Sequence, residues 1–213
     1  MNDNQSLITQ LASDESDQRR EAALALGRAR AVGAVEALIS TLQDDEAEVR
    51  LAAMNALRLI HDERASIPII KLLNDPDTAI RRGASTWFMT ITGDQSALVE
   101  PLCEIMLAED SRMSTREFAA MLLGKFGDER AVDALHQVMV DHPRLQTRVI
   151  QTLRRMADPR SVPVLIPLLD AANEMRVQAT AAKTLTAIDT PEARAAVMAW
   201  RQRTGKAGPD ERK

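Results

Sequence analysis

Few side chains in this sequence could bind a metal ion or take part in catalysis. The chain has three histidines, and two of them, His61 and His142, stand beside an aspartate where a turn is expected. His136 falls within an expected helix six residues before His142, and no third ligand follows at a spacing typical of a zinc site. We therefore expect no metal and no cofactor, and we interpret the two histidines at the turns as solvated.

The one cysteine, Cys103, has neither a histidine neighbour nor an expected helix N-terminus that would favour the reactive thiolate. A lone cysteine cannot form an internal disulfide, which fits a reducing compartment. The sequence shows no serine in a nucleophile elbow and no glycine-rich phosphate loop. We interpret Cys103 as a buried structural thiol and expect no catalytic residue, so the sequence favours a protein that is not an enzyme.

One stretch, residues 144–160, is strongly basic. Its arginines are Arg144, Arg148, Arg154, Arg155 and Arg160. Such a patch could bind an acidic protein or a phosphate backbone. The chain as a whole, however, has a net charge of −4 and a pI near 5.5, whereas proteins that bind nucleic acid usually carry a basic surplus. A solvated outer helix is the favoured interpretation, and binding of nucleic acid or of an acidic partner through this patch is an alternative.

An internal repeat of about 31 residues sets where these side chains lie. Each copy starts at an arginine or glutamine and carries small or apolar residues three, seven and ten positions later. The six copies start at Arg19, Arg50, Arg81, Arg116, Gln146 and Gln178, so successive starts are 31, 31, 35, 30 and 32 residues apart. These offsets fall on one stripe of a helix. The repeat therefore predicts a series of amphipathic helices.

Each stripe ends at a break that often carries an aspartate, and a second apolar helix follows. The residues placed to cap these second helices are Asp62, Asp94, Asp128, Asp158 and Asp189. A hairpin of about 31 residues cannot bury both apolar faces by itself, so neighbouring hairpins must stack. With 2% aromatic residues and no tyrosine, the composition also favours helices over strands. The sequence predicts an all-α solenoid.

The residue pattern of the repeat resembles a known family. Val49 and Arg50 open a segment of the form VRxxAAxALxxI that ends at Ile60, and a second match runs from Arg116 to Asp128. These segments resemble HEAT repeats, especially the short bacterial type first associated with phycobilin lyases. The resemblance covers roughly residues 15–203. It implies a right-handed α-α superhelix of about six helical hairpins, an armadillo-like architecture that commonly binds proteins.

The resemblance also implies a structural role for recurring acidic and basic residues. In HEAT repeats such residues form a ladder of hydrogen bonds between neighbouring repeats. The residues concerned here are Asp44, Arg50, Asp75, Arg81, Asp110 and Arg116. Gln146 and Gln178 replace the arginine in the last two copies, so the ladder is expected to be weaker there.

The family that this sequence resembles includes two kinds of enzyme. HEAT-type deoxyhypusine hydroxylases hold two iron ions with repeated His-Glu pairs, and this chain contains no His-Glu dipeptide. A bilin lyase, or an accessory subunit of one, is the alternative function that the resemblance implies. The lack of tyrosine and the few aromatic residues argue against a site that holds a flat tetrapyrrole.

The sequence further predicts the organisation of the chain. We expect a single solenoid over residues 1–203, an N-terminal half-repeat at about 3–13 that covers the first hairpin, and a disordered tail at 204–213. The N-terminus is polar rather than apolar, and no stretch reaches the ~20 apolar residues of a spanning helix. A cytoplasmic protein without membrane contact is therefore expected.

In this architecture the second helices line the concave face. The side chains expected to point from it are Glu36, Ser40, Lys71, Glu100, Glu104, Asp133 and Gln137. We predict a non-catalytic scaffold or adaptor that binds a protein with a basic segment along this acidic face, and ordinary solubilising surface charge is the alternative. Trp87 replaces the alanine found in the two preceding repeats, either to fill space or to anchor a partner.

Overall fold

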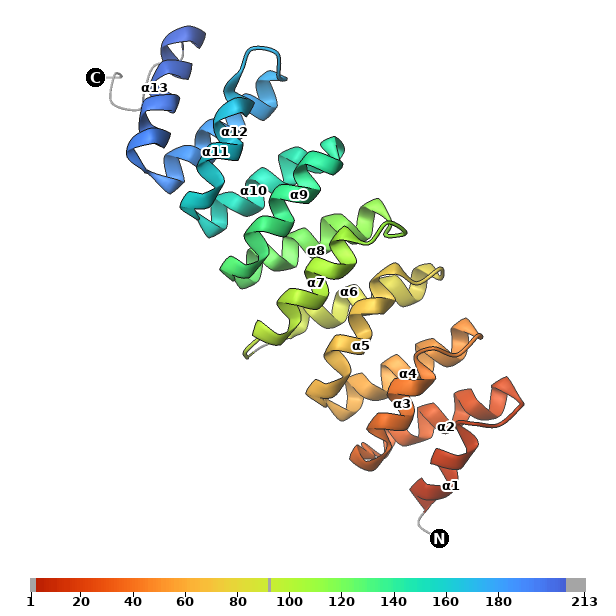
Figure 1. Cartoon of the computed structure of the whole chain (residues 1–213). Helices are drawn as coiled ribbons and strands as arrows, with labels where there is room; N and C mark the ends of the chain where they lie inside the picture. The colour runs from red at the N-terminus through yellow and green to blue at the C-terminus, as the bar shows by residue number, and fades with distance from the viewer. Residues whose placement is uncertain (1–2, 92, 206–213) are drawn as a thin grey trace. The chain divides into compact units, whose positions relative to one another are not determined.

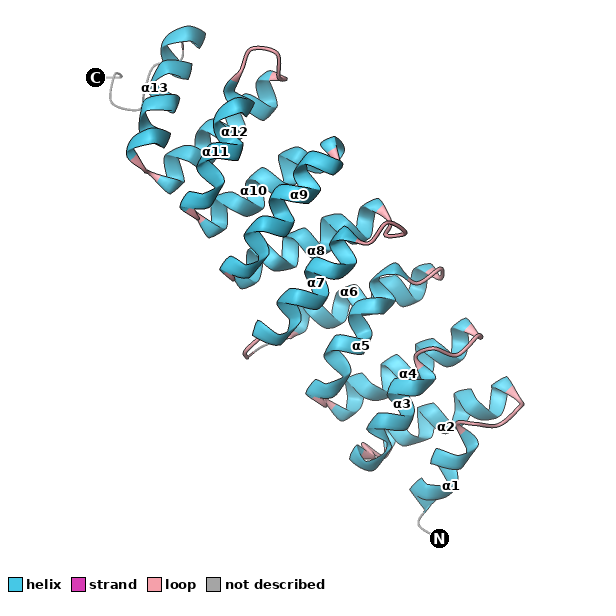
Figure 2. Cartoon of the chain, in the orientation of Figure 1, coloured by secondary structure: helices cyan, strands magenta, loops and turns pink. Residues whose placement is uncertain are grey.

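The computed structural model describes residues 3–91 and 93–205, and every regular element within them is a helix (Figures 1 and 2). The α-helices are α1 (Asp3–Gln10), α2 (Ser16–Arg28), α3 (Val35–Thr41), α4 (Ala47–Ile60), α5 (Ser66–Lys71), α6 (Thr78–Thr90), α7 (Val99–Leu107), α8 (Met113–Phe126), α9 (Val132–Asp141), α10 (Gln146–Met156), α11 (Val162–Leu165), α12 (Met175–Ile188) and α13 (Pro191–Thr204). Short 3-10 helices flank most second helices: η1 (Val32–Ala34), η2 (Glu63–Ala65), η3 (Leu72–Asn74), η4 (Ser96–Leu98), η5 (Glu129–Ala131), η6 (Pro143–Leu145), η7 (Pro159–Ser161) and η8 (Ile166–Leu169). The predicted all-α solenoid of helical hairpins is confirmed.

The chain forms two compact units, Met1–Pro101 and Leu102–Lys213, and the boundary falls within α7. In the first unit α2, α4 and α6 pack in chain order, and α3 packs against α4. In the second unit α8, α10 and α12 pack in the same way, and α9 packs against α10. The first helix of each hairpin therefore forms the continuous layer of its unit, and the second helix covers one side of that layer.

The two ends of the chain add to these units. Helix α1 packs against α2 at the position of the predicted half-repeat, where Leu11 is buried and Leu7 and Ile8 are partly exposed. At the other end Thr204 still belongs to α13, and residues 206–213 of the predicted tail lie outside the described residues. No helix in the described part of the chain is long and apolar enough to cross a bilayer.

The predicted apolar stripe forms the core of each unit. Leu26, Leu57 and Phe88, each seven residues into its repeat, are fully buried in the first unit. Leu123 and Leu153 occupy the same position in the second unit and are also fully buried. The period of the sequence pattern therefore identifies the inward side of every first helix.

Small residues let neighbouring first helices approach closely. A Cβ atom on Gly27 of α2 would lie 2.7 Å from the Cα atom of Ala56 in α4, which is too close for any side chain. In the second unit a Cβ atom on Gly124 of α8 would lie 2.6 Å from Cγ2 of Thr152 in α10. Glycine at these two positions thus sets the distance between helices.

Four of the five predicted aspartate caps are confirmed. Asp62, Asp94, Asp128 and Asp158 each accept a hydrogen bond from the backbone N–H two residues later, at the start of the second helix. The prediction for Asp189 is wrong, because this residue adopts a left-handed conformation (φ 59°) and closes α12 through its backbone N–H. Thr190 caps α13 instead and accepts a hydrogen bond from the Ala193 N–H.

Candidate functional site

The side chains predicted to line the binding face stand on second helices, on either side of a buried leucine. In the first unit Leu38 of α3 is fully buried, whereas Glu36 and Ser40 beside it are exposed. Lys71 at the end of α5 and Glu100 in the first turn of α7 are exposed as well. The second helices therefore anchor themselves through the leucine and present polar side chains to solvent.

The second unit repeats this arrangement. Leu102 of α7 and Leu135 of α9 are fully buried, and Glu104, Asp133 and Gln137 are exposed around them. Neither Glu104 nor Asp133 forms an ion pair within the described part of the chain. Both carboxylates are therefore available to a cationic partner, although the charge of Asp133 also acts on Arg160 and His136.

An arginine that the sequence analysis did not place also belongs to this face in the first unit. The Nε and Nη2 atoms of Arg64 donate to Oδ1 and Oδ2 of Asp62 at 2.9 and 2.8 Å. Its Nη1 atom donates to Oε1 of Glu36 in the preceding hairpin at 2.8 Å. Glu36 is consequently already paired, and this part of the face carries both signs of charge.

An arginine that pairs through two nitrogens with the aspartate two residues before it is called a fork here. The same fork recurs twice in the second unit. Arg130 pairs with Asp128 at 2.8 and 3.0 Å, and Arg160 pairs with Asp158 at 2.8 Å. Arg160 also donates to the backbone carbonyl of Glu129 in the preceding hairpin at 2.8 Å. The Asp-x-Arg spacing at the start of three second helices is the sequence signal that could have revealed these forks.

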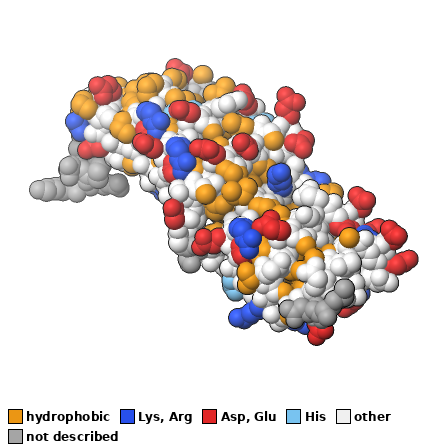
Figure 3. All heavy atoms as spheres, turned by 60° about the horizontal axis from the view of Figure 1, so that its bottom comes forward, with side chains coloured by type: hydrophobic (Ala, Val, Ile, Leu, Met, Phe, Trp, Pro, Cys, Tyr) orange, Lys and Arg blue, Asp and Glu red, His pale blue; other side chains and the backbone are white. Residues whose placement is uncertain are grey.

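Figure 3 shows one face of the molecule, where charges of both signs lie among hydrophobic side chains.

The forks fix the charge states of their members. Hydrogen bonds from Arg64, Arg130 and Arg160 are the main reason that the pKa values of Asp62, Asp128 and Asp158 are lowered. The same bonds raise the pKa of Arg64 and Arg160. Each of these aspartates therefore stays ionised to a lower pH than an unpaired carboxylate does.

The predicted basic patch lies in the second unit. Arg144 in η6 and Arg148, Arg154 and Arg155 in α10 are all exposed, and none of them forms an ion pair with a described residue. The opposite side of α10 buries Val149, Ile150 and Leu153. The patch thus lies on the solvent side of η6 and α10, and no ion pair with a described residue neutralises its charge.

The residues considered for chemistry are scattered. His61 is exposed at the end of α4, and His136 of α9 shares a hydrogen bond of 3.0 Å with the buried Ser161 hydroxyl. Burial is the main reason that the pKa of His136 is lowered.

Cys103 is only partly buried, so the interpretation as a buried thiol is wrong. The neighbouring Leu102 takes the inward position of α7 instead. The described residues contain no group of three or more His, Cys, Asp or Glu side chains that could hold a metal ion.

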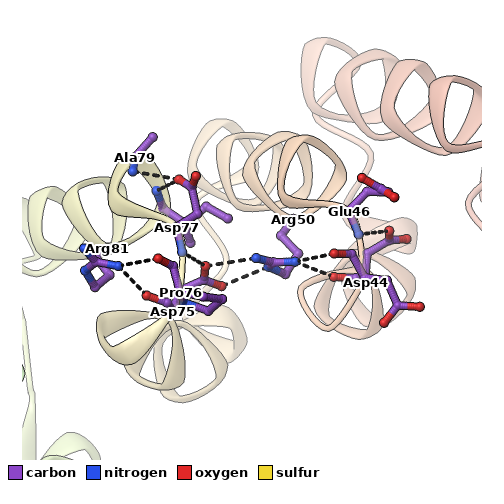
Figure 4. A network of polar contacts seen from close by, with 10 residues as sticks. Asp44, Glu46, Arg50, Asp75, Pro76, Asp77, Ala79 and Arg81 are labelled. Atoms are coloured by element: carbon purple, nitrogen blue, oxygen red, sulfur yellow. Dashed lines mark hydrogen bonds and ion pairs between the residues drawn. The ribbon is translucent and has the colours of Figure 1, made fainter. Parts of the chain in front are cut away.

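The ladder residues form contacts between successive loops of the first unit (Figure 4). Arg50 donates from Nε and Nη2 to Oδ2 and Oδ1 of Asp75 at 2.9 and 3.0 Å, and from Nη1 to the Asp44 carbonyl at 2.8 Å. Arg19, which the sequence analysis left out of the ladder, makes the equivalent pair with Asp44 at 2.6 and 2.8 Å. The paired carboxylate is therefore 25 residues after the arginine, and the residue six before it contributes a carbonyl.

The other ladder arginines bind carbonyl groups. Arg81 donates to the carbonyls of Asp75 and Pro76 at 2.6 and 2.8 Å. In the second unit Arg116 donates to the carbonyls of Met106 and Ala108 at 2.5 and 2.7 Å. Where glutamine replaces the arginine, Gln178 donates to the Asn173 carbonyl at 2.7 Å and accepts from the indole N–H of Trp200 at 2.9 Å.

A pocket of about 270 Å³ opens in the first unit, where the end of α4 meets the start of α5 and the end of α6. Trp87 lines it and is 9% exposed, so most of the indole packs against the protein. The pocket is completed by Arg58, His61, Asp62, Glu63, Ser66, Thr90 and Ile91. Trp87 therefore fills space and also forms the wall of a pocket.

Comparison with known proteins identifies the family. The sequence profile of the family described as HEAT repeats matches residues 4–90, 68–148, 99–175 and 140–206. The chain belongs to the HEAT repeat family. The HEAT profile thus spans both compact units, and the resemblance drawn from the sequence is confirmed. Among curated proteins, none is significantly similar in sequence to this chain.

Three solved structures are similar to this chain at low sequence identity. An engineered protein is 23% identical with a TM-score of 0.50, covering 94% of this chain and 62% of its own. Human deoxyhypusine hydroxylase in complex with glycerol is 22% identical with a TM-score of 0.46, covering 99% of this chain and 79% of its own. The complex of CpcE and CpcF of phycocyanin lyase from a Nostoc species is 19% identical with a TM-score of 0.45, and 95% of each chain is covered.

Proposed function

We propose that this HEAT-repeat protein is a non-catalytic scaffold that binds a protein partner along the exposed face of its second helices. The observation that carries the proposal is the exposure of polar side chains on both sides of the buried leucines Leu38, Leu102 and Leu135. A stack of hairpins offers an extended surface of this kind, which suits a polypeptide better than a small molecule.

The partner is proposed to contribute a basic or polar segment. Glu104 and Asp133 support this choice, because they are exposed and unpaired within the described chain. The forked arginines limit it, because Arg64 already neutralises Glu36 in the first unit. A segment with one or two cations opposite Glu104 and Asp133 fits this pattern better than a long polybasic stretch.

A charge-reversal experiment tests the proposal. The tagged protein and its Glu100→Lys/Glu104→Lys variant are used to capture partners from native lysate, with identification by mass spectrometry. The control is Asp17→Lys/Glu21→Lys, which makes the same charge change with the same spacing on the first helix α2, where both acids are exposed. A partner retained by the wild type and the control, but lost from the α7 variant, is the expected result.

Retention by all three proteins would contradict binding through this face. The unpaired arginines of α10 then support a second candidate, an acidic partner bound by the basic patch. Arg154→Glu/Arg155→Glu tests it in the same format, because both side chains are exposed and lie opposite the buried side of α10. Loss of the partner from this variant alone would assign binding to the patch.

A further inference from the structure

The pocket beside Trp87 has the composition of a binding site. We propose that it binds a carboxylate carried on a short apolar body, and that its occupant is the apolar C-terminal residue of a partner polypeptide. The site lies wholly within the first unit and is formed by the ends of α4 and α6 and the start of α5. It shares with the face of the second helices only Asp62, the partner of Arg64, and it does not depend on the proposed function.

Two of the residues that line this pocket, Ser66 and Trp87, carry hydrogen-bond donors. Ser66 is 5% exposed and Trp87 is 9% exposed, yet neither the hydroxyl nor the indole N–H forms a hydrogen bond with any described residue. Neither atom is among the side-chain polar atoms that are sealed from solvent without a partner. Both therefore remain reachable. Because neither donor is used within the described chain, both can donate to an acceptor from outside.

The charges around the pocket favour an anion. Arg58 is exposed and forms no ion pair within the described chain. Asp62 does not oppose an anion strongly, because both of its oxygens already accept hydrogen bonds from Arg64. Guanidinium, hydroxyl and indole N–H groups together match the oxygens of a carboxylate. Glu63 is the one exposed acid in the lining, and it should weaken binding.

The size and the apolar wall select the rest of the ligand. A volume of about 270 Å³ lies just below the ~300–1,000 Å³ that is typical of ligand pockets, so the ligand must be small. Trp87 and Ile91 supply an aromatic and an aliphatic surface for one apolar side chain. Capture of a C-terminal carboxylate is a recurring mode of peptide recognition, and in this pocket the apolar wall would hold the side chain of the same residue.

The two tryptophans allow a direct test on the full chain. The indole N–H signals are followed in a proton–nitrogen correlation spectrum, and Trp87→Phe assigns them. N-acetyl-leucine is expected to shift the Trp87 signal in a dose-dependent manner. The Trp200 signal should stay in place, because its N–H is held by Gln178 in the other unit. N-acetyl-leucinamide, which lacks the negative charge, should bind at least about tenfold more weakly.

Variants separate the proposed contacts from general effects. Arg58→Gln should weaken N-acetyl-leucine about tenfold, whereas Glu63→Gln should strengthen it. Arg82→Gln, an exposed arginine of α6 outside the lining, should change nothing. An equal shift with the amide, or no shift with either compound, would overturn the proposal. Isovalerate is a free organic acid with the same apolar side chain but without a peptide group. If it binds as tightly as N-acetyl-leucine, the pocket binds free organic acids, and the proposal of a polypeptide C-terminus is wrong.

Discussion

Arg50 and Asp75 form a buried bidentate ion pair that joins α4 to the loop before α6. The two hydrogen bonds measure 2.9 and 3.0 Å, and the side chains are 11% and 4% exposed. The same guanidinium also holds the carbonyls of Asp44 and Asp45 in the loop before α4. One side chain therefore connects the two loops that flank its hairpin, which couples neighbouring repeats in the first unit.

Removing the carboxylate from this pair should destabilise the first unit strongly. In Asp75→Ala the buried Arg50 charge loses its partner, and we expect the free energy of unfolding to fall by about 3 kcal/mol. The matched control is Glu48→Ala, which breaks the surface pair with Arg20, whose side chains are 35% and 78% exposed; a loss below about 0.5 kcal/mol is expected. Urea unfolding followed by circular dichroism measures both. Equal losses would show that the buried pair has no special role.

Asp44 should make the first unit sensitive to acid. Its pKa lies below the ordinary value of 3.8, mainly because of the hydrogen bond from Arg19. In the unfolded chain the carboxylate takes up its proton near pH 3.8, whereas the folded state resists protonation, so stability present above that pH is lost as the pH falls through the folded pKa. Asp44→Asn should unfold more easily at neutral pH and lose part of this acid dependence, as measured by urea midpoints between pH 6 and pH 3. The control is Glu192→Gln, an exposed acid of α13 in the other unit, which should leave the acid dependence of the first unit unchanged.

The repeat period predicted the fold because it reflects burial directly. Residues seven positions into each copy, such as Leu57 and Leu153, are fully buried as the pattern requires. The ends of helices were harder to predict, because capping depends on backbone conformation. Asp189 has the residue type of a cap but adopts a left-handed conformation, and Thr190 performs the role instead.

The candidate sites were less accessible from the sequence. Exposure of Glu104 and Asp133 follows from helix periodicity. The pairing of Glu36 with Arg64 does not, because it joins side chains 28 residues apart in different hairpins. The pocket beside Trp87 was equally hidden. A large residue at a position of close helix contact can either fill the space or hold the helices apart, and only the packed structure shows that a pocket remains.

Gly27 should be required for the contact between α2 and α4. In Gly27→Ala the added Cβ atom would meet the Ala56 backbone at 2.7 Å, and a backbone atom cannot move aside without displacing the helix. We expect a loss of about 1–3 kcal/mol in unfolding free energy. Gly33 in η1 is the control, since a Cβ atom there meets nothing within 4 Å. Thermal unfolding of Gly33→Ala should match that of the wild type, and a similar loss in both variants would place the effect outside the helix contact.

Thr152 and Gly124 should be coupled across α8 and α10. Thr152 donates to the Ala120 carbonyl at 3.3 Å, and its Cγ2 atom occupies the space beside Gly124, 2.6 Å from where a Cβ atom would lie. Gly124→Ala alone should therefore destabilise the second unit. Thr152→Ser removes the methyl group but keeps the hydroxyl, so the double variant should recover most of that loss. A double-mutant cycle of urea unfolding should give a coupling energy of about 1 kcal/mol. Simple additivity would mean that the new Cβ atom is limited by the α10 backbone rather than by the methyl group, and that the spacing of these helices is set by main-chain contact alone.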